Sequence, residues 1–171
     1  MSFLELSKSR YSTRRFSSRP VEEDKIAALY EVIRNAPTAK NLQPQKVFVL
    51  RSKEAIEKAK RATPCTYGAP LVFLVCIDMG TVWNHPAHPE VNTADIDGAI
   101  VTTQLALEAA DLGLGSVIVR LFDIEQTQEI FNLPKNLKPI LFLPVGYKDE
   151  QDAPSPKHTD KKPLEDFIVE L

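Results

Sequence analysis

Residues 70–78 constrain the fold of this chain more than any other stretch. They read Pro-Leu-Val-Phe-Leu-Val-Cys-Ile-Asp, with apolar side chains at odd and even positions alike. Side chains of a strand alternate between the two faces of a sheet, so a strand with this pattern must be covered on both faces. We therefore predict a central strand here. The apolar run is too short to cross a bilayer, and no membrane is expected as a partner.

Helical periodicity, capping residues and short β-branched runs predict the other elements. Helices do not follow every strand, which favours an α+β fold in one domain, residues 1–171, over a doubly wound sheet. The proline-rich residues 80–91 are expected to be irregular. The expected helices cover residues 3–9, 20–35, 52–61, 93–112 and 123–132, and the expected strands cover residues 46–50, 70–78, 116–119 and 138–145.

The helix expected over residues 93–112 is rich in small residues. Ala99, Ala106 and Ala110 contribute to a wide apolar face. A helix with such a face is deeply buried. We expect it to pack in its own domain and, as an open alternative, against a twin in a second subunit.

Composition argues against several kinds of partner and site. The net charge is −2, so no global field would attract nucleic acid. The first residues lack the pattern of a signal peptide. Cys65 and Cys76 lack the spacing of a metal site, and a cytoplasmic protein without disulfides is the simplest expectation. His85 and His88 could ligate a metal with a nearby aspartate, but histidines in a proline-rich stretch are more often only part of a loop, so no metal is expected.

Three residues near the start of the chain suggest an anion site. If the segment is extended, Arg10, Ser12 and Arg14 point to one side and Arg15 points to the other. Guanidinium groups bind phosphate oxygens two at a time, and the serine adds a neutral donor. The pattern predicts a phosphate clamp, although taken alone it fits an exposed basic loop equally well.

A second candidate is the loop over residues 37–43. It offers a hydroxyl, two amides and a lysine, which suit the edge of a planar polar heterocycle. Taken alone, the loop could be a capped turn; together with the clamp it predicts the second half of one ligand site. The chain has no G-x-G-x-x-G or Walker A motif, and no histidine belongs to a recognisable nucleophile elbow.

Four blocks of sequence resemble, in order, the FMN-dependent nitroreductase family. They are Arg-x-Ser-x-Arg-x-Phe at 10–16, Ala-Pro-Thr-Ala-x-Asn-x-Gln-Pro at 36–44, Ala-Ala-Asp-Leu-Gly-Leu-Gly at 109–115, and Pro-Val-Gly-Tyr at 144–147 with Lys-Lys-Pro-Leu-Glu at 161–165. Together they cover nearly the whole chain. Family members often have an aromatic residue after Gln-Pro, where this chain has Gln45. They often have small residues beside the flavin, where this chain has Arg120 and Leu121. These departures bear on the substrate more than on the cofactor.

The resemblance implies an α+β, nitroreductase-like fold with a central, mainly antiparallel sheet flanked by helices. It also implies an intertwined homodimer with two FMN sites at the interface, and an arm, residues 147–171, that docks on the partner subunit. Residues of the 37–41 loop would reach the flavin of the partner, and a backbone N–H near Arg120 would face flavin N5. The residues implied to bind FMN are Arg10, Ser12, Arg14, Pro37, Thr38, Ala39, Asn41, Val119, Arg120, Leu121 and Lys161.

The resemblance further implies an FMN-dependent NAD(P)H oxidoreductase. Hydride would pass through flavin N5 to a small electrophile, such as a nitroaromatic or a quinone, by a ping-pong scheme. The flavin performs this chemistry, so no catalytic side chain is expected, and Arg14 would stabilise negative charge at flavin N1/O2. Two alternatives stay open: a flavin-storage or oxygen-using protein of the same fold, and a flavin-free protein whose basic cluster binds phosphate or an acidic partner.

Overall fold

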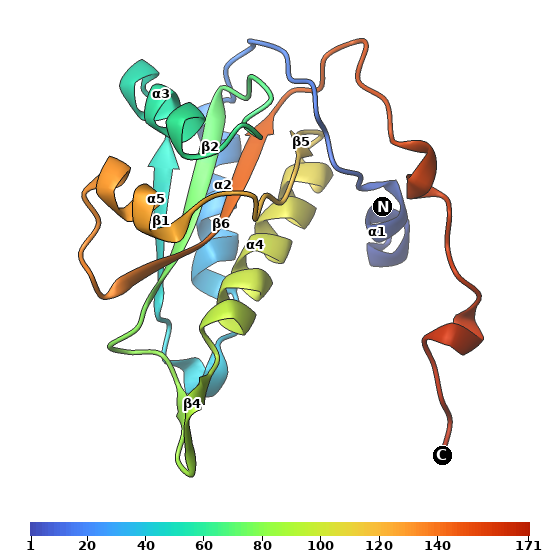
Figure 1. Ribbon diagram of the computed structural model, residues 1–171. Helices are drawn as coiled ribbons and strands as arrows, with labels where there is room; N and C mark the ends of the chain where they lie inside the picture. Colours follow the sequence, from blue (N-terminus) through green and yellow to red (C-terminus); the bar gives the residue numbers. More distant parts are fainter.

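The strand predicted over residues 70–78 lies in the middle of the sheet (Figure 1). The computed structural model describes residues 1–171 apart from the side chain of Pro89. In it, β2 (Leu71–Asp78) lies between β1 (Gln45–Leu50) and β6 (Leu137–Gly146), and both pairs are antiparallel. The central strand is therefore confirmed.

Two helices cover each face of the sheet. The helices are α1 (Phe3–Ser9), α2 (Glu23–Asn35), α3 (Lys53–Ala62), α4 (Ala94–Asp111) and α5 (Ile124–Phe131). Leu71, Phe73 and Val75 of β2 pack in one core cluster with residues of α2 and α4. The alternate residues of β2 pack in a second cluster with residues of α3 and α5. The resulting three layers confirm the predicted α+β fold with a mainly antiparallel sheet (Figure 1).

Capping hydrogen bonds explain where three helices begin. Ser2 and Glu5 form a capping box at the start of α1, in which Ser2 Oγ accepts from the Glu5 N–H at 3.2 Å. Ser52 and Asp123 accept similar bonds at the starts of α3 and α5. These local signals act within four residues and could therefore be recognised in the sequence.

Residues 80–91, predicted to be irregular, include a two-stranded hairpin. β3 (Asn84–His85) and β4 (His88–Asn92) pair antiparallel and are separate from the main sheet. The prediction rested on the prolines of this stretch and was wrong. Pro86 lies in the turn between the two strands, where its missing N–H breaks no ladder bond.

The strand predicted over residues 116–119 is shorter than expected. β5 (Gly115–Ser116) pairs with β6 and completes the order β1-β2-β6-β5. The chain then meets β6 again at a single bridge, where the Val119 N–H donates to the Phe142 carbonyl at 2.9 Å. Similarly, α2 begins at Glu23 rather than near residue 20, because Glu22 is still extended with a ψ of 148°.

After β6 the chain stays bonded to the body of the molecule as far as His158 and then leaves it. The arm, residues 147–171, contains only two short 3-10 turns, η2 (Pro156–His158) and η3 (Leu164–Asp166). Figure 1 shows it running past α1 and ending away from the sheet. Across the part of the chain that the structure describes, no helix is both long enough and apolar enough to cross a membrane.

Candidate functional site

The segment over residues 10–16 is extended, as predicted, and it lies along the edge of the sheet. Ser12 forms a parallel bridge with Ser116 of β5, and the Thr13 N–H donates to the Ser116 carbonyl at 3.0 Å. Phe16 forms an antiparallel bridge with Lys148. Thr13 and Phe16 are buried and fix the segment. The segment that carries Arg10, Ser12 and Arg14 is therefore held at the C-terminal end of α4.

Two glycines allow this close approach. Gly113 has a φ of 75° and ends α4 with a left-handed turn. A Cβ at Gly115 would lie 2.8 Å from Thr13 Cγ2, and closer still to Thr13 Oγ1. The family-like sequence Gly-Leu-Gly thus serves to place β5 directly against the clamp segment.

The two clamp arginines are available for an anion. Among the described residues, neither Arg10 nor Arg14 forms an ion pair with a carboxylate, whereas Arg19 and Arg51 each pair with a glutamate. Arg14 Nη1 donates to the Ser12 carbonyl at 3.3 Å, which keeps this side chain close to Ser12.

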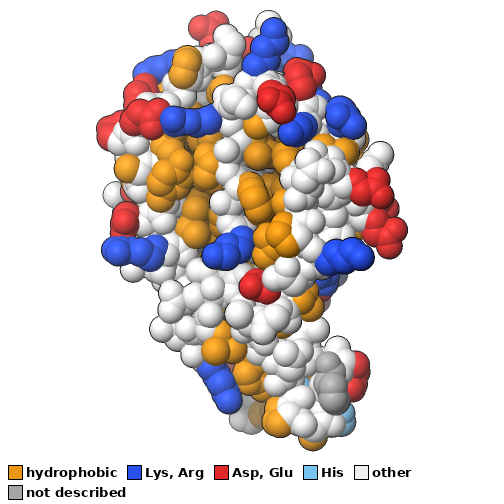
Figure 2. All heavy atoms as spheres, turned by 90° about the vertical axis from the view of Figure 1, so that its left-hand side faces the viewer, with side chains coloured by type: hydrophobic (Ala, Val, Ile, Leu, Met, Phe, Trp, Pro, Cys, Tyr) orange, Lys and Arg blue, Asp and Glu red, His pale blue; other side chains and the backbone are white. Residues whose placement is uncertain are grey.

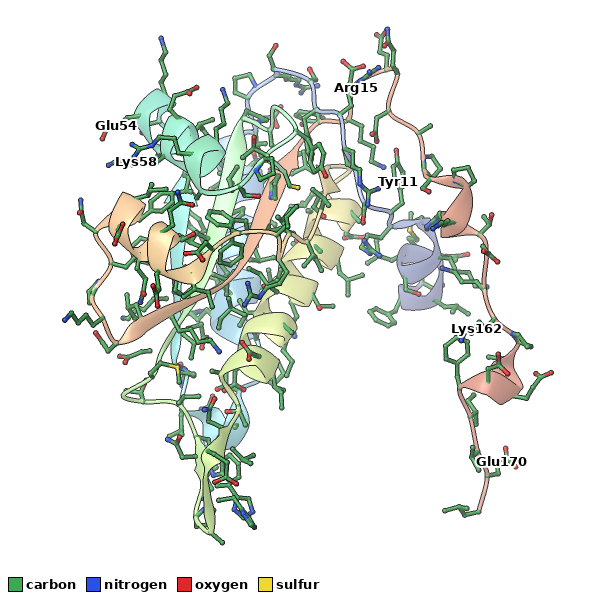
Figure 3. All side chains as sticks on the ribbon, in the orientation of Figure 1. Tyr11, Arg15, Glu54, Lys58, Lys162 and Glu170 are labelled. Atoms are coloured by element: carbon green, nitrogen blue, oxygen red, sulfur yellow. The ribbon has the colours of Figure 1, made fainter. Side chains whose placement is uncertain are left out.

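Arg15 belongs to the other side of the segment. Its Nη1 donates to Gln151 Oε1, and Figure 3 shows it beside the loop that follows β6. This orientation agrees with its omission from the predicted site.

Lys148 is a basic residue of this region that the sequence did not single out. It lines a cavity of about 210 Å³ together with Arg10, Tyr11 and Ser116. Its Nζ lies 4.4 Å from the centre of the Tyr11 ring. Partial burial, reinforced by a hydrogen bond with Asp152, raises the pKa of Tyr11 to about 12. The ring therefore stays neutral, and the cavity carries two positive side chains.

The stretch after β5 adds backbone groups to the same end of the molecule. Val119 is buried, while Arg120 and Leu121 are exposed. The guanidinium of Arg120 lies 4.9 Å from the centre of the Phe122 ring. Among the described residues, nothing accepts a hydrogen bond from the Arg120 N–H. The Leu121 carbonyl accepts from Thr63 Oγ1 at 2.8 Å, which ties this stretch to the loop before β2.

The loop predicted to complete the site lies at the other end of α4. It contains the 3-10 turn η1 (Ala39–Asn41), and the Ala39 N–H donates to Asp97 Oδ1, near the start of α4, at 3.0 Å. The 18 residues of α4 span about 27 Å between this loop and the clamp. Figure 1 shows the two ends well apart. One chain therefore does not bring Pro37, Thr38, Ala39 and Asn41 to the clamp.

Lys161 also lies apart from the clamp. It is exposed on the arm, and no contact with Arg10, Ser12 or Arg14 is seen among the described residues. Figure 3 shows the neighbouring Lys162 on the part of the arm that has left the body.

The sequence matches the model of the nitroreductase family over residues 7–65 and 57–147, most of its length. The chain belongs to the nitroreductase family. This membership confirms the resemblance carried by the four sequence blocks, and with it the oxidoreductase class. All of the arm after Tyr147 lies beyond the matched residues.

Similar proteins agree with this assignment. A nitroreductase family protein of Clostridium difficile 630 is 40% identical, with a TM-score of 0.91 over 99% of this chain and 98% of that chain. An NADPH-dependent oxidoreductase of Staphylococcus saprophyticus is 27% identical over 168 residues, which cover 89% of this chain and 67% of the relative. An FMN-dependent nitroreductase of Clostridium difficile R20291 is 20% identical and shares the fold, with a TM-score of 0.80 over 98% of each chain.

Proposed function

We propose that the chain is a homodimeric, FMN-dependent oxidoreductase that uses NAD(P)H to reduce a small electrophile of the nitroaromatic or quinone type. One observation carries the proposal: the two halves of the predicted flavin site stand at opposite ends of α4, about 27 Å apart. A flavin site that combines the two would take its clamp from one copy and its loop from another. Related proteins described as an NADPH-dependent oxidoreductase and an FMN-dependent nitroreductase support the same function.

The groups at the clamp fit a flavin nucleotide. Among the described residues, the guanidinium groups of Arg10 and Arg14 form no ion pair, as expected of side chains that bind an anionic ligand, although the Arg14 backbone N–H donates to Asp152 Oδ1 at 3.1 Å. Arg10 and Ser12 would bind the phosphate and the ribityl chain, and Arg14 would bind the pyrimidine edge. The free N–H of Arg120 would donate to flavin N5, beside Val119 and Leu121.

These residues bind and tune the cofactor and do not themselves react. Bound FMN would supply the hydride-transfer chemistry between NAD(P)H and the acceptor, in a ping-pong scheme. The Arg14 cation would stabilise negative charge at the N1/O2 edge of a bound flavin, which would raise the reduction potential. Lys161 would supply a second positive charge to the phosphate once the arm is docked.

The exposed face of α4 supports the dimer. One side of the helix is buried on the sheet, and the other side presents an open apolar groove. Ile96 is 59% exposed, which is unusual for a large apolar side chain in a helix of this composition. Small residues such as Ala99 allow a second helix to approach closely. A twin α4 would bury this groove and would bring each loop toward the clamp of the other subunit.

The arm supports the same assembly. Its last apolar side chains are exposed, each by more than half: Leu164, Phe167, Ile168, Val169 and Leu171. Figure 3 shows Glu170 at the far end of the arm. The apolar side chains of the arm could pack against the edge strand β1 of the partner subunit. Figure 2, which faces this edge, shows hydrophobic side chains gathered between lysine and arginine side chains. A groove of about 460 Å³ there is lined by residues that include Ile33, Val47 and Val49.

The absorption spectrum of the purified protein tests the function. We expect the bands of bound flavin, and we expect NADH or NADPH to bleach them without oxygen. A flavin that binds but is not reduced by either nicotinamide would favour the storage or oxygen-using alternative. A protein that binds phosphate but no flavin would favour the flavin-free alternative.

A further inference from the structure

The loop at the N-terminal end of α4 has a strained backbone. Lys40, Asn41 and Gln43 have φ values of 51°, 56° and 51°. These values lie in the left-handed region, which residues other than glycine adopt rarely and only where their surroundings hold them. Thr38 Oγ1 holds one side of the loop by accepting from the Gln43 N–H at 3.0 Å. Besides the loop's own backbone hydrogen bonds, a second side-chain restraint comes from α4.

Asp97 supplies that second restraint. It is 1% exposed, and its Oδ1 accepts from the Ala39 N–H at 3.0 Å. Its Oδ2 accepts from Thr93 Oγ1 at 2.8 Å. No lysine, arginine or histidine of the described residues forms an ion pair with it. A buried carboxylate without a counter-ion is costly, and here two hydrogen bonds and the N-terminal end of α4 compensate for the burial.

We propose that Asp97 is a positioning residue of the flavin site. It fixes the Pro37–Asn41 loop on the first turn of α4, so that the loop meets the flavin held by the clamp of the partner subunit. This inference rests on the proposed function. The side chain of Asp97 does not touch the flavin; it acts through the backbone of Ala39.

The location of Asp97 on α4 supports this role. Its chain neighbour Ile96 is 59% exposed on the face that would contact the partner, while Asp97 itself points into the protein. A single helical turn therefore carries both the dimer contact and the anchor of the loop. Loss of the anchor would leave the dimer contact in place and would release the loop from the flavin.

The test compares Asp97→Ala with a control on the same helix. Thr102 is also fully buried on α4, where its Oγ1 donates to the Gly98 carbonyl at 2.7 Å, but it has no bond to the loop. Thr102→Val therefore perturbs the helix without touching the anchor. FMN affinity is measured by fluorescence titration, amide hydrogen exchange is followed at Ala39, and light scattering reports the oligomeric state.

We expect Asp97→Ala to remain dimeric, to speed exchange at Ala39, and to raise the Kd for FMN about tenfold. We expect Thr102→Val to leave the exchange rate at Ala39 and the Kd for FMN within about twofold of the values of the unaltered protein. If Asp97→Ala does not fold, Asp97→Ser replaces it in the comparison. The serine side chain is one bond shorter than that of aspartate, so its hydroxyl does not reach the Ala39 N–H. Equal FMN affinity in the Asp97 and Thr102 variants would overturn the inference while leaving the function intact. If the unaltered protein fails to bind FMN, the proposed function falls, and the inference falls with it.

Discussion

The contact between Gly115 and Thr13 allows a quantitative test of how the clamp is held. Gly115 does not have a left-handed backbone, so alanine is not strained there by conformation. The added Cβ would lie 2.8 Å from Thr13 Cγ2 and 2.9 Å from Thr13 Cβ, far inside normal contact. The Thr13 backbone N–H donates to the Ser116 carbonyl and its side chain is fully buried, so Thr13 has little room to move aside.

Overpacking of this kind costs about 1–3 kcal/mol. Replacement of glycine by alanine returns about 0.4–1 kcal/mol, because it reduces the freedom of the unfolded chain. We therefore expect Gly115→Ala to lower the free energy of unfolding by about 1–2 kcal/mol net. Thr13→Ala removes the two clashing atoms beyond Cβ, so it should restore part of this loss in the double variant.

Urea unfolding of the four proteins in this cycle measures the coupling between the two positions. We expect the double variant to be more stable than the sum of the single effects by about 1 kcal/mol, as for residues in direct contact. The reasoning would be refuted by additive effects, or by a Gly115→Ala variant as stable as the unaltered protein.

Three further predictions follow from the same structure. Arg14→Ala should weaken FMN binding by about 1.5–3 kcal/mol, the value of a hydrogen bond to a charged group, while Arg15→Ala should not; fluorescence titration measures both. A chain that ends at His158, the last residue bonded to its own body, should lose dimer stability in light scattering. Glu22 has its pKa lowered from 4.5 to about 2, chiefly by the hydroxyl of Tyr147, so its contribution to stability is present above pH 4.5 and is lost as the pH falls toward 2. In a plot of the urea unfolding midpoint against pH, Glu22→Gln should therefore reduce the fall in the midpoint between pH 4.5 and pH 2.

Much of the fold could be predicted because its signals are local. The two-sided apolar pattern of residues 70–78 identified the central strand, and caps such as Ser52 marked where helices begin. The hairpin over residues 84–92 was missed because each strand forms only two paired positions, and the pairing depends on the turn rather than on periodicity.

The candidate site was predictable only in part. The extended clamp follows from alternation within one segment, so Arg15 could be left out before the fold was known. The contributions of Lys148 and Asp97 could not be predicted, because each depends on a contact between segments that are remote in the sequence. The separation of clamp and loop by the length of α4 likewise becomes visible only in three dimensions.

A mixed dimer tests most directly the claim that each site combines a clamp and a loop from different subunits. One chain would carry Arg10→Ala with Arg14→Ala, and the other would carry Thr38→Val with Asn41→Ala, each with its own affinity tag. We expect neither homodimer to bind FMN tightly. The purified heterodimer has one site built from two intact halves, and we expect it to bind one FMN per dimer. A heterodimer that binds no FMN would contradict the shared site.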